Sequence, residues 1–151
     1  MLKDDDRRIL RRWQDDPGFS FAELSDALGL SAQKVARRVE KLKESGVVRG
    51  TRAVIDWRAL GYEVEVSLRF SLDKTQRNAF DDFIAAAREV PEVIEIQTFL
   101  GKVDVRLNVI ARDMAHYQAL YRDAILTLPH IADIEALMHV ATVKSQDRLP
   151  I

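Results

Sequence analysis

The sequence predicts an α+β protein built from an N-terminal winged helix-turn-helix domain and a C-terminal ferredoxin-like domain with the element order βαββαβ. Apolar residues recur with the period of a helix in the first third and mostly with the period of a strand in the rest. The charge divides at the same place, since residues 1–53 hold 12 basic and 9 acidic side chains whereas residues 54–151 hold 11 and 15. We therefore expect a cationic domain at 1–53, a linker at 54–61 and a second domain at 62–151.

The composition excludes several classes of protein. A chain of 151 residues with 47% hydrophobic and 31% charged residues is typical of a globular protein. It has no cysteine, which excludes disulfides, thiolate metal sites and cysteine nucleophiles. No apolar run approaches the roughly 18 residues of a membrane span, and the start MLKDDDRR lacks the apolar core of a signal peptide. We expect a cytoplasmic protein that has no membrane partner.

Three helices are expected in the first third. The acidic run at 4–6 suits the start of the first helix, and Asp-Pro-Gly at 16–18 ends it. Ser20 and Glu23 have the spacing of a capping box at the start of the second helix. A glycine turn then leads to Ser31, which caps the third helix. Two helices joined by a short glycine turn form a helix-turn-helix motif.

The third helix has two stripes of different chemistry. Val35, Val39 and Leu42 form an apolar stripe, and the second stripe is entirely basic, comprising Lys34, Arg37, Arg38 and Lys41. Such a helix can lie in a DNA major groove while its cations approach phosphates, and Gln33 near its start can pair with adenine. The alternative is a solvated face on which the two glutamates of the helix pair with the cations.

A short strand is expected at 47–55, where Arg49 and Arg52 would contact the DNA backbone like a wing. The expected DNA-binding residues are Ser31, Gln33, Lys34, Arg37, Arg38, Lys41, Arg49 and Arg52.

The second domain begins with strict alternation of apolar and polar residues at 64–72. The further expected elements are a helix at 75–89, a strand at 93–100, a tight turn at 101–102, a strand at 103–109, a helix at 114–128 and a last strand within 131–143. This order is that of the split ferredoxin-like unit, whose helices cover one face of a four-stranded sheet. We expect the other face to be apolar, and Met138 and Val140 on the last strand suggest dimerisation from sheet to sheet.

Catalytic and metal-binding patterns are absent from the sequence. The three histidines (116, 130 and 139) match no metal-ligand spacing, and we interpret each as a surface or interface residue. There is no phosphate-binding glycine loop and no nucleophile elbow. We therefore expect no metal, no cofactor and no enzymatic activity.

The chain resembles the Lrp/AsnC (feast/famine, leucine-responsive regulatory protein) family of transcription regulators along its whole length. The segments that carry the resemblance are DRRIL at 6–10, LSDALGLS at 24–31, RRVEKL at 37–42, GVVRG at 46–50, GKVD at 101–104 and Leu-Pro at 128–129. The resemblance implies a DNA-binding domain followed by a RAM (regulation of amino-acid metabolism) domain. It also implies homodimers that assemble into octamers, with small effectors, commonly amino acids, bound between dimers.

The same resemblance implies an effector site at the turn of the second domain. Its residues would be Phe99, Leu100, Gly101, Lys102, Val103 and Asp104, with Met138, Val140 and Thr142 of the last strand lining the pocket. The alternative is a plain hairpin with a turn glycine and a turn aspartate. The usual family loop is Gly-Asp-aromatic-Asp, whereas this chain has a lysine and a valine at its second and third positions. We expect an effector that is more acidic or smaller than those of typical relatives, or no response.

The function expected from these observations is sequence-specific DNA-binding regulation of amino-acid or nitrogen metabolism by a protein that a small effector modulates. One alternative is an architectural protein that wraps DNA without sensing a metabolite. Another is an enzyme similar to the siroheme decarboxylases, which share the two-domain layout. Those enzymes would need haem-contacting histidines near the second and third strands, where this chain has Gln97, Thr98, Phe99 and Asn108.

Overall fold

A computed structural model describes residues 2–145 and 148–151 of the chain. Contacts divide it into two compact units, of which the first comprises residues up to Val54 together with Lys144–Ile151 and the second comprises Ile55–Val143. The three helices and the βαββαβ order confirm the predicted α+β class. The domain boundaries 1–53, 54–61 and 62–151 stay a prediction, and the structure groups residues 144–151 with the first unit.

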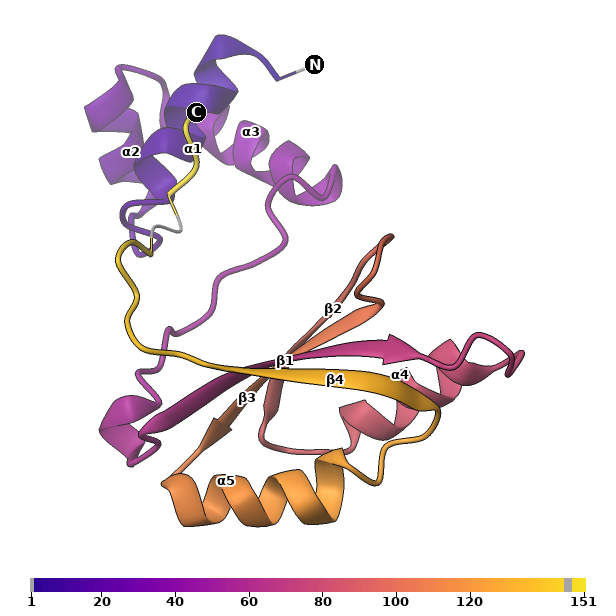
Figure 1. The fold of residues 1–151 in the computed structure, drawn as a ribbon. Coiled ribbons are helices and arrows are strands. Elements are labelled where there is room, and N and C mark those ends of the chain that lie inside the picture. The colour runs from indigo at the N-terminus through magenta and orange to yellow at the C-terminus, as the bar shows by residue number, and fades with distance from the viewer. Residues whose placement is uncertain (1, 146–147) are drawn as a thin grey trace. The chain divides into compact units, whose positions relative to one another are not determined.

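The first unit contains α1 (Asp4–Trp13), α2 (Phe21–Leu28) and α3 (Ala32–Glu44) (Figure 1). The predicted capping box forms, because the Ser20 hydroxyl accepts the Glu23 N–H at 3.2 Å and the Glu23 carboxylate accepts the Ser20 N–H at 2.8 Å. Gly29 then adopts the left-handed conformation (φ 64°) that turns the chain into α3. One buried residue of α1, one of α2 and three of α3 form the core, namely Ile9, Leu24, Val35, Val39 and Leu42.

The strand expected at 47–55 is absent, and this part of the prediction was wrong. Residues 47–55 have no strand pairing, and Val54 and Ile55 are 86% and 67% exposed. A strand needs a neighbour to satisfy its backbone groups, and no segment of the described chain pairs with this one. The only regular element between α3 and the sheet is one short 3₁₀ turn, η1 (Arg58–Leu60).

The second unit is a four-stranded antiparallel sheet with both of its helices on one face (Figure 1). Its strand order is β2-β3-β1-β4, so the first and last strands lie side by side. The elements are β1 (Val64–Leu72), α4 (Ala79–Arg88), β2 (Val93–Thr98), β3 (Val105–Ala111), α5 (Met114–Leu120) with its π-helical continuation η2 (Tyr121–Ile125), and β4 (Ile131–Met138). The core lies between sheet and helices, where the rings of Phe70 and Phe83 pack at 4.8 Å.

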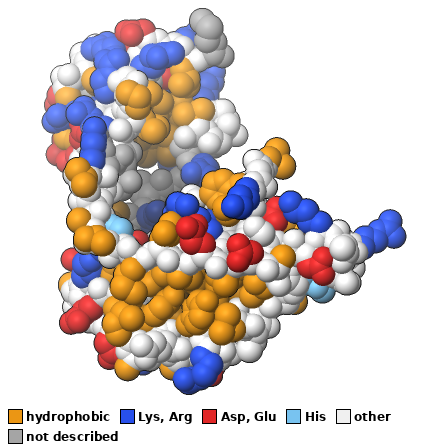
Figure 2. Space-filling view, in the orientation of Figure 1, with side chains coloured by type: hydrophobic (Ala, Val, Ile, Leu, Met, Phe, Trp, Pro, Cys, Tyr) orange, Lys and Arg blue, Asp and Glu red, His pale blue; other side chains and the backbone are white. Residues whose placement is uncertain are grey.

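The face of the sheet away from the helices is polar, so the prediction of a second apolar face was wrong. The alternation in β1 and β3 places charged or amide side chains there, and they pair with one another. Arg106 contacts Glu95 at 3.1 Å, and the Asn108 amide donates to Glu65 at 2.9 Å. The last residue of β4, Met138, lies opposite Val66 on the helix-covered face instead. Figure 2 shows hydrophobic side chains gathered between β4 and α5.

None of the helices within the described ranges is long and apolar enough to cross a lipid bilayer.

Candidate nucleic-acid interface and effector hairpin

The orientation of α3 is fixed by its cap and its core stripe. The Ser31 hydroxyl accepts the backbone N–H of Lys34 at 3.3 Å, which starts the helix. Val35 and Val39 are fully buried and Leu42 nearly so, as the sequence predicted. With that stripe in the core, the side of the helix that carries Gln33 is exposed.

The basic stripe of α3 is divided between two environments. Lys34 and Arg38 lie toward α1, where the Lys34 ammonium contacts Asp5 at 2.8 Å. The Arg38 guanidinium spans two carboxylates, contacting Asp5 at 3.1 Å and Asp6 at 2.7 Å, and its side chain is only 16% exposed. We call Asp5, Asp6, Lys34 and Arg38 the α1–α3 ion cluster. It joins the first helix to the third.

Both carboxyl groups of this cluster are held in their charged form. The hydrogen bond from Lys34, together with the nearby Arg38 charge, lowers the pKa of Asp5. Burial acts to raise the pKa of Asp6, but the Lys3 backbone N–H and the Arg38 guanidinium outweigh it and leave that pKa lowered. Both groups are therefore ionised at neutral pH, and two cations of the expected DNA-binding stripe are already neutralised within the protein.

The remaining cations of the expected site face solvent. Arg37 and Lys41 lie on the exposed side of α3, and Arg49 and Arg52 follow the helix in exposed chain. Across residues 2–145 and 148–151, none of these four has a carboxylate within ion-pairing distance. Unpaired cations beside an exposed amide such as Gln33 form a surface that suits a polyanion with readable base edges.

The roles of Asp5 and Asp6 were missed by sequence reasoning. The acidic run at 4–6 was interpreted through the helix dipole alone, and that interpretation is compatible with its position in the first turn of α1. The signal that could have revealed more is the match of two adjacent carboxylates to two cations one helical turn apart on α3. These groups meet only when α1 packs against α3, and that packing is not evident from the sequence.

The turn between β2 and β3 is held rigidly to β1. The Asp104 carboxylate accepts the Leu72 backbone N–H at 2.9 Å, and its other oxygen contacts the Lys74 ammonium at 3.1 Å. The Leu72 bond, with the help of Lys74, keeps the pKa of Asp104 below its ordinary value. The Ser71 hydroxyl donates to the Lys102 carbonyl at 2.7 Å. We call residues 99–104 the effector hairpin.

The hairpin presents apolar and cationic side chains rather than its aspartate. Leu100 is fully exposed and Phe99 is 45% exposed, and Lys102 also faces solvent. Both oxygens of Asp104 are engaged by other groups of the same chain, the Leu72 backbone N–H and the Lys74 ammonium.

The structure does not bring the two predicted halves of the effector site together within one chain. The hairpin lies at the end of β1 near Phe70, which pairs with Val105. Met138 lies opposite Val66, four residues or about 13 Å away along the strand. Val140 and Thr142 follow beyond the end of β4.

The histidines lie apart and each contacts a different carboxylate. These pairs are His116 with Glu92 at 3.5 Å, His130 with Asp82 at 2.9 Å and His139 with Glu65 at 3.5 Å. Among the described residues, no three side chains of metal-ligating type cluster in space.

A helix-turn-helix unit with an exposed cationic helix, followed by a sheet domain with a presented hairpin, defines the class of DNA-binding regulators that carry a ligand-binding domain. Family comparison agrees with this class. The AsnC-type helix-turn-helix domain matches residues 3–43, and the Lrp/AsnC ligand binding domain matches residues 65–149. The chain belongs to the Lrp/AsnC family of transcription regulators, as its resemblance predicted.

Individual relatives align over almost the whole chain. The proline dehydrogenase transcriptional activator of Rhodobacter capsulatus is 32% identical, over 94% of this chain and 92% of its own. The leucine-responsive regulatory protein of Rhizobium meliloti is 30% identical, over 97% and 94%. The crystal structure of the transcriptional regulator NMB0573 from Neisseria meningitidis, in complex with L-methionine, is 26% identical and superposes with a TM-score of 0.90 over 99% of this chain and 97% of that one.

Proposed function

We propose that α3 reads DNA through the face that carries Gln33, Arg37 and Lys41, and that the second unit modulates this binding when it takes up a small effector in the cytoplasm. The observation that carries the DNA-binding part is the exposure of these three residues opposite a fully packed core stripe. In a major groove, Arg37 and Lys41 would contact phosphates and Gln33 would pair with a base edge.

The other residues of the expected interface take different roles in this proposal. Arg49 and Arg52 contact the DNA backbone beside the groove, because they are exposed and unpaired within the described chain. Ser31 and Arg38 set the position of the recognition helix, through the cap and the α1–α3 ion cluster. Lys34 belongs to the same cluster, and it approaches DNA with its ammonium group already paired with Asp5.

The salt dependence of DNA binding tests this assignment. Arg37→Ala should weaken binding to all sequences and reduce the magnitude of the slope of log K against log salt by about 1, since one phosphate contact is lost. The measurement is fluorescence anisotropy at several salt concentrations, with a duplex selected from a random-sequence library.

Lys43→Ala is the matched control for that measurement. Lys43 lies on the same helix and is also exposed, but its charge is paired with Glu40 at 3.2 Å. Its removal should leave both the affinity and the slope unchanged. Equal slopes for wild type and Arg37→Ala would show that another surface holds the DNA.

We infer that the effector is an amino acid bound between two copies of the chain. A pocket that needs both the effector hairpin and the end of β4 cannot form within one protomer, because the two lie at opposite ends of β1. The L-methionine complex of the Neisseria meningitidis regulator supports this class of ligand. Lys102 at the hairpin favours an acidic or small amino acid.

This proposal requires at least a homodimer. An octamer would form if further copies met through their effector hairpins. The apolar strip between β4 and α5, where Met138 is 50% exposed, supplies a surface for a second copy (Figure 2). Val140 and Val143 beyond the strand are 95% and 98% exposed. Covering exposed apolar side chains such as these with a second copy removes apolar area from water, which favours association.

Calorimetry with the twenty amino acids tests the effector proposal. We expect one acidic or small amino acid to bind, and Lys102→Asp to weaken it at least about tenfold through charge reversal beside the ligand. Lys43→Asp makes the same charge change in the other unit and should leave affinity intact. Equal affinity for wild type and Lys102→Asp would remove Lys102 from the site, and absence of any ligand would favour the architectural alternative.

A further inference from the structure

Residues 148–151 lie against the end of α1, in the first unit. Contacts group them with the first unit, and Figure 1 shows the end of the chain beside α1. Four direct interactions join this segment to Arg11 in the last turn of α1 and to Gln14 and Asp15, which follow the helix.

The central contact is made by one side-chain amide with a backbone. Gln14 donates its amide N–H to the Leu149 carbonyl at 3.2 Å and accepts the Leu149 backbone N–H at 2.9 Å. The amide thereby satisfies both polar groups of one residue, as a neighbouring strand would. This recognition is made through the Leu149 backbone and leaves Leu149 62% exposed.

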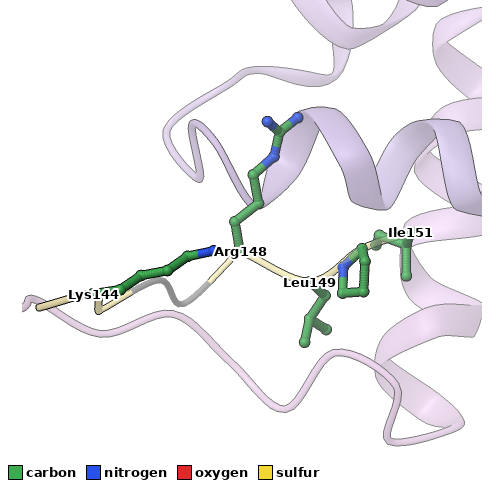
Figure 3. A pocket seen from close by; sticks show the side chains of 5 residues that line it. Lys144, Arg148, Leu149 and Ile151 are labelled. Carbon is green, nitrogen blue, oxygen red and sulfur yellow. The ribbon is translucent and has the colours of Figure 1, made fainter.

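The flanking contacts select a particular segment. The Arg148 guanidinium contacts the Asp15 carboxylate at 3.0 Å, and the Arg11 guanidinium donates to the Ile151 carbonyl. Ile151 is half-buried. The segment also lines a shallow pocket of about 410 Å³, formed by Lys144, Arg148, Leu149, Pro150 and Ile151. Figure 3 shows the side chains that line this pocket.

We propose that the end of α1 and the turn after it are a docking site for the chain's own segment 148–151, recognised in the same protomer through the Leu149 backbone, the Arg148 side chain and Ile151. The first unit is then tethered to the second at two points, through the chain that leaves α3 and through the chain that returns after β4. A second tether restricts the orientations available to the recognition helix and so raises its effective concentration at a correctly spaced DNA site.

Site-specific photo-crosslinking tests the docking. A p-benzoylphenylalanine in place of Leu149 should crosslink to the peptide that contains residues 8–16, within a single chain as judged by mass. The position suits the probe because the Leu149 side chain is exposed while its backbone makes the contacts. The same probe in place of Val140, which is 95% exposed in the second unit, should give no crosslink to α1.

Two variants test whether the crosslink depends on the contacts of Gln14 and Asp15. Gln14→Leu removes both backbone hydrogen bonds, and the crosslink yield should fall about tenfold. Asp15→Arg should lower the yield about two- to fivefold, as expected for a lost exposed ion pair, and the added Arg148→Asp should restore it.

Three outcomes would contradict the proposed docking. Yields that do not change in Gln14→Leu, crosslinks to other peptides, or crosslinks between two chains would each overturn docking in the same protomer. The experiment is made on the full chain without DNA, so its result stands apart from the proposed DNA-binding role of α3.

Discussion

Replacement of Phe83 by alanine is expected to lower the free energy of unfolding of the second unit by about 3–5 kcal/mol. Phe83 is fully buried on α4 and packs its ring against Phe70 of β1. Its loss leaves a cavity between the helix and the sheet that rigid strands cannot close. Native-state hydrogen exchange of peptides from β1 and β3, followed by mass spectrometry, measures the change within this unit.

Phe80→Ala is the matched control on the same helix. Phe80 lies three residues before Phe83 on the same helix, but it is 43% exposed whereas Phe83 is fully buried. We expect a loss below about 1 kcal/mol, because this side chain gives up much less buried area. Similar losses for both variants would mean that α4 is rotated about its axis relative to the sheet.

The second large effect is expected in the first unit. Arg38→Ala should lower its free energy of unfolding by about 1–3 kcal/mol, since Asp5 and Asp6 lose the guanidinium that neutralises them. The figure is below that of a fully buried pair because these three side chains remain 15–21% exposed. Hydrogen exchange of the α1 and α3 peptides measures it.

Arg37→Ala separates stability from DNA binding at the neighbouring position. Arg37 is exposed and makes no ion pair within the described residues, so its removal should change stability by less than about 0.5 kcal/mol. The proposal for α3 requires that the same variant lose affinity for DNA. A stability loss in Arg37→Ala as large as that in Arg38→Ala would contradict the division of the basic stripe.

Local signals in the sequence predicted the helical unit well. The Ser20–Glu23 capping box and the Ser31 cap are set by side chains within three residues of the backbone groups they satisfy. Gly29 adopts its left-handed conformation because it has no Cβ. The period of β1 likewise identified its buried face. Such features depend on neighbours along the chain, which a sequence displays directly.

Features that depend on distant contacts were not predicted. Lys34 and Arg38 are neutralised by two carboxylates some thirty residues earlier in the chain. The charge pattern of the helix alone does not distinguish these two cations from Arg37, which stays exposed. The contacts of residues 148–151 with Arg11, Gln14 and Asp15 join the two ends of the described chain, and the sequence gives no local sign of them. The polar face of the sheet is a local feature, because alternate residues of β1 are already polar or charged in the sequence.

The central pairing of β1 with β4 sets an order in which the chain can fold during its synthesis. All three helices of the first unit lie within residues 4–44, so the contacts among these helices close over short distances soon after they leave the ribosome. β1 follows early but acquires β4 only when residue 138 has been made. Until then one side of β1 is an open edge with unsatisfied backbone groups. We expect the nascent second unit to be most prone to aggregation, and most dependent on chaperones, during this interval.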